Sequence, residues 1–285
     1  MKELSSCQQA IENCAATQTF AIAHLYKEEK TMDMHIHDCY EIYYSISGGR
    51  QFLIDNRFYA IEPGDLFIIN QYESHKITQV DKAVHERIVL SIHPDYTRRL
   101  ASPATDLDAC FTNRPGNFCH KLSLSKEQQN RFLYYIHKIT DAKGYGQDIL
   151  EQTAFMELLV LLNRLVLSNR PARQAAPCVY NQQVDDILKY INRNITVTIT
   201  IGQLAGEFYL SESYICRIFK AATGTTVGKY ITARRISIAK ALLSDGAGVT
   251  EAFEKSGFTD YSSFFKSFTR AVGISPKKYA QCSVS

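Results

Sequence analysis

The sequence predicts two domains: an all-β barrel that ends in a helical segment, followed by an all-α domain. Three observations support this fold class. Short β-branched and aromatic segments alternate with turn residues from about residue 18 to 92. A long apolar stripe with helical spacing comes next, and the C-terminal part contains an internal repeat. We therefore expect a first domain at residues 1–168, a linker at 169–181 and a second domain at 182–285.

Composition is typical of a globular protein. Of the 285 residues, 45% are hydrophobic and 21% charged, and no apolar run is long enough to cross a membrane. The N-terminus lacks the apolar block of a secretory signal, so we expect a cytoplasmic protein. The eight cysteines form no C-x-x-C pair, which argues against a structural zinc site of paired thiolates.

Charge is divided unevenly between the two parts. Residues 181–285 contain 13 basic and 8 acidic side chains, whereas residues 1–180 contain 19 and 21. The positive excess therefore lies in the C-terminal part, where we expect a polyanion to bind.

Six segments in the first domain have the composition of strands. They are separated by turn signals such as SGG at 47–49 and EPGD at 62–65. Their close, even spacing favours a barrel or sandwich over βαβ units. The segments are TFAIAHLY (19–26), YEIYYSIS (40–47), RQFLID (50–55), RFYAIE (57–62), DLFIIN (65–70) and ERIVLSIH (86–93).

Two helices are expected to close the first domain, one starting at Ser125 and one covering about 147–169. The second has a helical stripe of Leu150, Ala154, Leu158, Leu161 and Leu165. This stripe is expected either to pack on the barrel or to pair with a second subunit, and both can hold if different faces are used. The segment at 169–181 has two prolines and no periodicity, as expected of a linker.

The C-terminal part contains a duplicated unit. SYICRIFKAATGTTVGKY at 213–230 matches SSFFKSFTRAVGISPKKY at 262–279 at a constant offset, with glycine, lysine and tyrosine repeated at equivalent places. Each copy has the pattern of a helix-turn-helix, and GKYITARRISIAKALLSDG at 228–246 is a helical connector between them.

The second helix of each unit has one apolar and one polar face. Ile215 and Phe219 in the first copy, and Phe264 and Phe268 in the second, are expected to be buried. The opposite faces are narrow, polar and basic, which suits the major groove of DNA. The candidate DNA-binding residues are Ser213, Cys216, Arg217, Lys220, Tyr261, Ser262, Ser263, Lys266 and Arg270.

This part of the chain closely resembles the AraC-type (AraC/XylS) family of bacterial transcription regulators. The resemblance rests on LA at 204–205, SxSYICRIFK at 211–220, RIxxAxxLL at 235–243, GF at 257–258, FFKSF at 264–268 and GISPKKY at 273–279. It implies sequence-specific binding to double-stranded DNA, contact with RNA polymerase, and activation of transcription by a homodimer.

Two positions depart from the family pattern. Phe253 stands where the first helix of the second unit commonly has a small residue, so we expect a bulky ring at the helix crossing. Thr269 replaces a common lysine and removes one candidate phosphate contact.

The first domain resembles the cupin-like sensory domains of this family. HIHDCYE at 35–41 and PGDLFIINQYESH at 63–75 match the two cupin motifs, and His35, His37, Glu41 and His75 fall at the four metal-ligand positions. The set is chemically competent to bind a divalent transition metal. The same residues, with Tyr43, can instead hydrogen-bond a polar effector, and the resemblance suggests a carbohydrate. A network satisfied within the core is the third alternative.

We conclude from the sequence that the chain is a ligand-responsive transcription regulator, with no cofactor required and no enzymatic activity. Fusion to a DNA-binding domain favours a sensing pocket, because switching transcription requires no chemistry on the ligand. Two alternatives remain: a cupin metalloenzyme with a helical appendage, and a ligand-independent DNA-binding protein whose barrel serves only for assembly.

Overall fold

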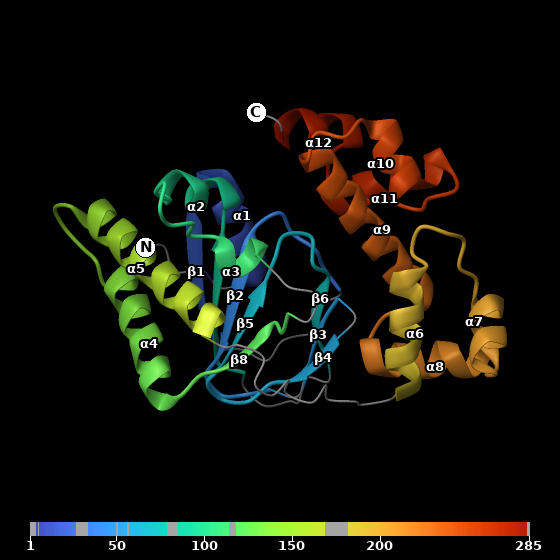
Figure 1. Ribbon diagram of the computed structural model, residues 1–285, viewed down its shortest axis with the longest axis horizontal. Coiled ribbons are helices and arrows are strands. Elements are labelled where there is room, and N and C mark those ends of the chain that lie inside the picture. The colour runs from blue at the N-terminus through green and yellow to red at the C-terminus, as the bar shows by residue number, and fades with distance from the viewer. Residues whose placement is uncertain are drawn as a thin grey trace.

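A computed structural model describes residues 4, 6–26, 34–49, 51–55, 57–78, 85–113, 118–168 and 182–283. It has a β-rich N-terminal domain and a helical C-terminal domain, as the sequence predicts (Figure 1). The expected linker at 169–181 lies outside the described residues. Within the described part, no helix is long and apolar enough to span a bilayer.

The N-terminal domain contains two antiparallel sheets. The larger has the order β1–β7–β2–β5–β8 and the smaller β4–β3–β6. The six predicted segments all form strands; β6 and β8 were not predicted. The strands are β1 (Phe20–Leu25), β2 (Tyr40–Ser45), β3 (Gln51–Ile54), β4 (Arg57–Ala60), β5 (Asp65–Ile69), β6 (His75–Thr78), β7 (Arg87–Ile92) and β8 (Lys121–Ser123).

Alternation along β2 assigns its side chains to two different cores. Ile42 and Tyr44 lie in the core between the larger sheet and the helices that cover it, whereas Tyr43 lies in the core between the two sheets. Glu41 shares the face of Tyr43 and therefore points between the sheets. The register of β2 thus determines that the carboxylate lies inside the domain.

The described residues of this domain form five helices, and α4 and α5 pack on each other beside the larger sheet (Figure 1). Ser125 caps α4 through a capping box with Gln128, so this helix begins where the sequence predicts. The helices are α1 (Cys7–Thr17), α2 (Pro94–Leu100), α3 (Ala109–Thr112), α4 (Lys126–Thr140) and α5 (Gln147–Ser168).

The predicted apolar stripe of α5 packs against its own domain. Ala154, Leu158, Leu161 and Leu165 are buried in the core formed with the larger sheet, whereas Leu150 is 48% exposed. Of the two expectations for this stripe, packing on the barrel is therefore confirmed. A second subunit would have to use another face of the helix.

Residues 182–283, the part of the C-terminal domain that the structure describes, form seven helices, with one helix-turn-helix on each side of the long helix α9. α7 and α8 form the first unit, and α10 and α11 the second (Figure 1). The helices are α6 (Gln182–Arg193), α7 (Ile201–Phe208), α8 (Glu212–Thr223), α9 (Val227–Ser244), α10 (Val249–Lys255), α11 (Tyr261–Val272) and α12 (Pro276–Ser283).

The second helix of each unit, α8 or α11, is called its recognition helix, and the two have equivalent capping residues at both ends. Ser211 and Asp260 accept hydrogen bonds from backbone N–H groups in the first turns of α8 and α11. Gly224 and Gly273 end these helices with φ values of 68° and 83°, a conformation that favours glycine. The repeat in sequence is therefore a repeat in local structure.

The second unit has both a small residue and a bulky ring where α10 meets its neighbours. Ala252, and not Phe253, occupies the fully buried position on α10 in the core with α9 and α11. Phe253 lies at the edge, where its ring contacts Tyr261 and Phe264. The expected ring is therefore present against α11, and the fully buried small residue of α10 stands one place earlier in the chain.

The two domains share part of a hydrophobic core. Leu53 and Phe58, from the smaller sheet, are buried among apolar residues of α6, α8 and α9. The C-terminal domain therefore packs directly against the sheet that contains β6 (Figure 1).

Candidate functional site: a histidine–glutamate cluster beside a double helix-turn-helix

Four side chains separated by up to forty residues in the chain meet between the two sheets. The donor atoms of His35, His37, Glu41 and His75 all lie within 4.8 Å of one another. Glu41 comes from β2 and His75 from β6, while a β-bridge pairs His35 with His75 through N–H···O distances of 3.2 and 3.1 Å. The convergence expected from the two motifs is thus present, although the two N-terminal histidines precede β2 instead of lying within a strand.

Hydrogen bonds to backbone carbonyls orient two of the imidazoles. Nδ1 of His37 donates to the carbonyl of Cys39 at 2.9 Å, and Nδ1 of His75 donates to that of Glu73 at 2.9 Å. Their Nε2 atoms then face the carboxylate of Glu41, at 3.1 and 3.8 Å. Among the described residues, Nε2 of His75 has no hydrogen-bond partner.

The cluster is buried and strongly coupled. Burial acts to raise the pKa of Glu41, but the neighbouring imidazoles, His75 foremost, lower it to about 2. Burial acts to lower the pKa of His37; contact with Cys39 and Glu41 outweighs it, and the pKa is raised well above its usual value. Burial lowers the pKa of His75. A carboxylate faces an imidazole nitrogen favourably when that nitrogen is protonated or when the two groups share a cation.

The donor set fits a divalent transition metal. Both Nε2 atoms would offer lone pairs, because each ring is fixed through its Nδ1–H, an arrangement common among metal-binding histidines. A tetrahedral ion with bonds of about 2.0–2.2 Å needs ligand atoms about 3.4 Å apart, close to the spacing around Glu41. A proton on His37 or a polar ligand satisfies the same carboxylate.

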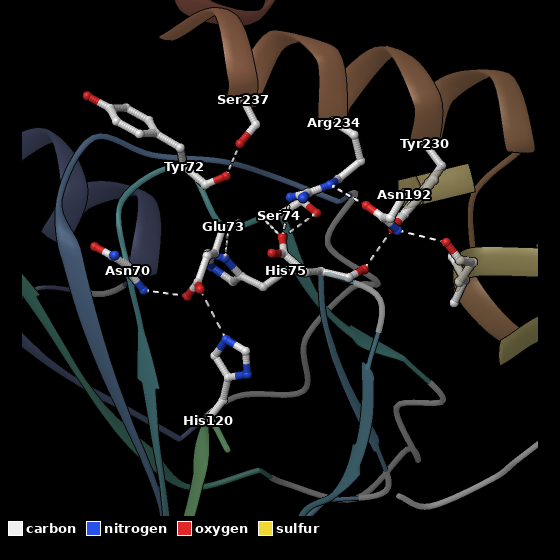
Figure 2. Close-up of polar contacts among 12 residues, drawn as sticks. Asn70, Tyr72, Glu73, Ser74, His75, His120, Asn192, Tyr230, Arg234 and Ser237 are labelled. Carbon is white, nitrogen blue, oxygen red and sulfur yellow. Dashed lines mark hydrogen bonds and ion pairs between the residues drawn. The ribbon is translucent and has the colours of Figure 1, made fainter. Parts of the chain in front are cut away.

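A further layer of polar residues, not predicted from the sequence, supports His75. The carboxylate of Glu73 accepts from the backbone N–H of Asn70 at 2.6 Å and contacts Nε2 of His120 at 3.1 Å (Figure 2). Tyr59 contacts the other nitrogen of His120 at 2.8 Å. The sequence offers only a weak signal for Glu73, which stands two residues before the candidate ligand His75. It offers none for His120, which lies in no recognisable motif.

Tyr43, the fifth candidate effector contact, lies on the face of Glu41 but within packed aromatic rings. Its ring centroid is 5.1 Å from that of Phe52 and 5.9 Å from that of Phe67. Tyr40 and Tyr44 lie on the opposite face and pack against Phe111 and Phe132. Most of the aromatic residues in these strands thus fill the core.

The candidate DNA-binding residues lie on the outer faces of the two recognition helices. The apolar residues expected to be inside, Ile215, Phe219, Phe264 and Phe268, are fully buried. The hydroxyl of Thr269, at the position where the family commonly has a lysine, is buried. All nine candidates are exposed: Ser213, Cys216, Arg217 and Lys220 on α8, and Tyr261, Ser262, Ser263, Lys266 and Arg270 on α11.

Comparisons with known proteins agree with both halves of this arrangement. Residues 19–159 match the family model described as an AraC-like ligand binding domain, and residues 204–281 match a helix-turn-helix domain. The melibiose operon regulatory protein of Escherichia coli (strain K12) is 25% identical over 288 residues, covering 93% of each chain. The transcriptional activator RhaR of Cronobacter sakazakii is 22% identical over 269 residues, covering 93% of this chain and 92% of its own.

Among solved structures, fatty-acid-bound ToxT from Vibrio cholerae matches 92% of this chain at 16% identity, with a TM-score of 0.40. The family models and the relatives span both domains in the same order. The chain therefore belongs to the AraC family of ligand-responsive, DNA-binding transcription regulators.

Proposed function

We propose that this chain is a transcription activator whose effector binds at the His35, His37, Glu41 and His75 cluster. The observation that supports this most directly is the convergence of the four side chains between the sheets of the ligand-binding domain. Imidazole and carboxylate groups can each pair with a hydroxyl group. The names of the melibiose operon regulatory protein and the activator RhaR support a carbohydrate effector and positive regulation.

We propose in addition that the cluster can bind a divalent transition metal through His35, His37, Glu41 and His75. Such an ion would supply a Lewis-acidic site for an oxygen of the effector. The buried Nε2 of His75 and the fixed tautomers support this assignment.

We do not assign an enzymatic activity to the site, since the relatives are regulators. The alternative, a cupin metalloenzyme, predicts substrate turnover by the metal-loaded protein. Metal analysis of the purified chain followed by activity assays distinguishes the two functions.

On DNA, we propose that α8 and α11 enter the major groove and that their exposed residues contact bases and phosphates. The protein would act in the cytoplasm as a homodimer and contact RNA polymerase at its promoters. Exposure of all nine candidate residues and the net positive charge of this domain support the DNA-binding part of the proposal.

The test is to replace His37 by alanine. Operator fragments are first identified by mapping bound DNA genome-wide with and without a panel of mono- and disaccharides. We expect His37→Ala to lose most of the response to the active sugar while retaining basal affinity for the operator, because the substitution lies in the other domain. His137→Ala, which removes an exposed imidazole on α4, is the matched control.

A purely structural role for the cluster predicts a different result. His37→Ala would then lower the free energy of unfolding by about 1–3 kcal/mol through lost hydrogen bonding. The melting temperature would fall, and the folded fraction would respond normally. A variant as stable and as inducible as the parent would exclude the effector assignment.

A further inference from the structure

One face of α9 is bound along its whole length to the N-terminal domain. Its residues are spaced three or four apart and each makes a polar contact across the domain boundary. We call this set the α9 docking stripe: Tyr230, Arg234, Ser237, Lys240 and Ser244.

Three described residues of the N-terminal domain contact the stripe: Asp38, Asp55 and Tyr72. Asp55 accepts from Tyr230 through its carbonyl, at 2.9 Å, and from Arg234 through its carboxylate. Tyr72 accepts from Ser237 through its carbonyl (Figure 2), and its hydroxyl lies 2.6 Å from that of Ser244. The ammonium group of Lys240 pairs with the carboxylate of Asp38 and lies 5.4 Å from the ring centroid of Tyr72.

Tyr72 begins a short segment, residues 72–75, that ends at His75 of the histidine–glutamate cluster. Asp55 Oδ1 accepts from the backbone N–H of Ser74 at 2.9 Å as well as from Arg234. The carbonyl of Glu73 orients His75, the next residue but one. Two of the three residues before His75 are therefore held by α9 or by its partner: Tyr72 by Ser237 of α9, and Ser74 by Asp55 (Figure 2).

Charge makes this contact sensitive to small displacements. The side chains of Arg234 and Lys240 are only 17% and 6% exposed, whereas their partners Asp55 and Asp38 are 22% and 48% exposed. Breaking either pair leaves a largely buried cation without its counter-charge, which is less favourable than the intact pair. The stripe is thus expected to be either docked or released as a unit, with few intermediate positions.

We infer that the α9 docking stripe couples occupancy of the histidine–glutamate cluster to the placement of both helix-turn-helix units. Segment 72–75 is the element that the two sites share. α9 in turn contacts α8, α10, α11 and α12, so that a shift of α9 moves both recognition helices. Because coupling between two sites is reciprocal, release of the stripe must also change affinity at the cluster. This inference rests on the proposed role of the cluster as a ligand site.

The test uses the full-length chain, with Zn²⁺ as the probe and Arg234→Ala as the variant. Without metal, we expect Arg234→Ala to increase hydrogen exchange in peptides covering residues 70–76. Zinc binding that remains in His75→Ala is subtracted, so that the difference reports the cluster. In Arg234→Ala this affinity should fall about tenfold, as is common when residues that orient a metal-binding side chain are lost. Zinc should slow exchange in peptides covering 230–244 in the parent but not in Arg234→Ala.

Lys255→Ala is the matched control, since it removes a positive charge from the same domain at an exposed ion pair with Glu251. It should leave both measurements unchanged. If Arg234→Ala does not fold, Ser237→Ala replaces it, because this substitution removes one hydroxyl and leaves both ion pairs intact. Unchanged exchange at 70–76 together with unchanged zinc affinity would refute the coupling.

Failure of the proposed function gives a distinct result. If the parent binds no zinc at the cluster, the metal proposal fails, and the comparison of His75→Ala with His137→Ala still tests the coupling. His75→Ala should then increase exchange at 230–244, and His137→Ala should not. Equal exchange in the two variants would overturn the inference, whatever the effector.

Discussion

Arg217 is the residue at which base recognition can be tested most directly. It projects from the exposed face of α8, with its guanidinium 5.2 Å from the ring centroid of Tyr214. We expect Arg217→Ala to weaken operator binding by about 1–3 kcal/mol and to relax the preference at one base pair, most simply a guanine. Binding selection with the parent and the variant measures both effects. Equal weakening on operator and random DNA would instead identify a phosphate contact.

Asp260 makes the second unit sensitive to acid. Its carboxylate accepts from the backbone N–H of Ser263 at 2.6 Å, and hydrogen bonding to Ser263 lowers its pKa. A carboxyl group with a lowered pKa stabilises the fold above its unfolded value, about 3.9, and this stabilisation is lost as pH falls through the folded value. We therefore expect α11 to be destabilised below about pH 4.

Asp260→Asn retains the capping acceptor but does not titrate. Thermal melting between pH 5 and pH 3 should thus show a shallower loss of stability in Asp260→Asn than in the parent. Parallel melting curves across this range would contradict the capping role. Ser211, the equivalent cap in the first unit, has no charge to lose.

The candidate cluster could be predicted from sequence because its ligands lie in two short motifs. Local spacing places His37 near Glu41, and only the motif match adds His75. Its supporting residues could not be predicted, since His120 reaches Glu73 by a contact between segments forty-seven residues apart. Contacts of that range depend on how the two sheets pack, which no local pattern encodes.

Among the helices, α5 has a second, outward stripe that suits a partner subunit. Ile149 and Leu167 are 59% and 67% exposed at its two ends, and Met156 and Val160 between them are only partly buried. We expect the double substitution Ile149→Asp/Leu167→Asp to yield folded monomers with much weaker operator binding, because two charges would have to be desolvated in the interface. Sedimentation velocity and gel-shift assays measure the two effects.

Leu158 and Leu165 are unsuitable for this test, although they belong to the stripe most visible in the sequence. Both are buried in the core of their own domain, where an aspartate would unfold it. Val197→Asp, at a position 56% exposed in the other domain, is the appropriate control. A double variant that sediments as a dimer would place the interface elsewhere.

Ala252 determines how closely α10 approaches its neighbours. Its side chain is fully buried, so Ala252→Leu should destabilise the second unit by about 1–3 kcal/mol through overpacking. Phe253→Leu, one residue later at the edge of the core, should have a smaller effect. Urea unfolding of the two variants compares them directly, and a larger effect at Phe253 would contradict the dominant role of Ala252.

Segments with strong periodicity or a clear strand composition were predictable, whereas β6 and β8 were not. β6 and β8 contain only four and three residues, and β8 exists through its pairing with β5. The polar face of α9 was also missed, because Ser237 and Lys240 have the sequence character of solvent-exposed residues. Only the packing of one domain on the other shows that both are buried.

At the scale of the whole molecule, the two recognition helices lie toward opposite ends of α9 (Figure 1). An 18-residue helix is about 27 Å long, comparable to the ~34 Å of one turn of DNA. We expect the base pairs affected by Arg217→Ala and by Lys266→Ala to lie about one helical turn apart on the same face of the operator. Binding selection with each variant locates them, and overlapping positions would exclude simultaneous engagement of both units.

Leu53 and Phe58 limit how freely this protein can be divided or recombined. They belong to the N-terminal chain but complete the apolar interior around α6, α8 and α9. A fragment beginning at residue 182 would present that surface to water and tend to self-associate. A hybrid regulator made by joining this ligand-binding domain to a foreign DNA-binding domain would need compatible residues at this surface. Exchange of parts between relatives should thus succeed only when the boundary surfaces are exchanged with them.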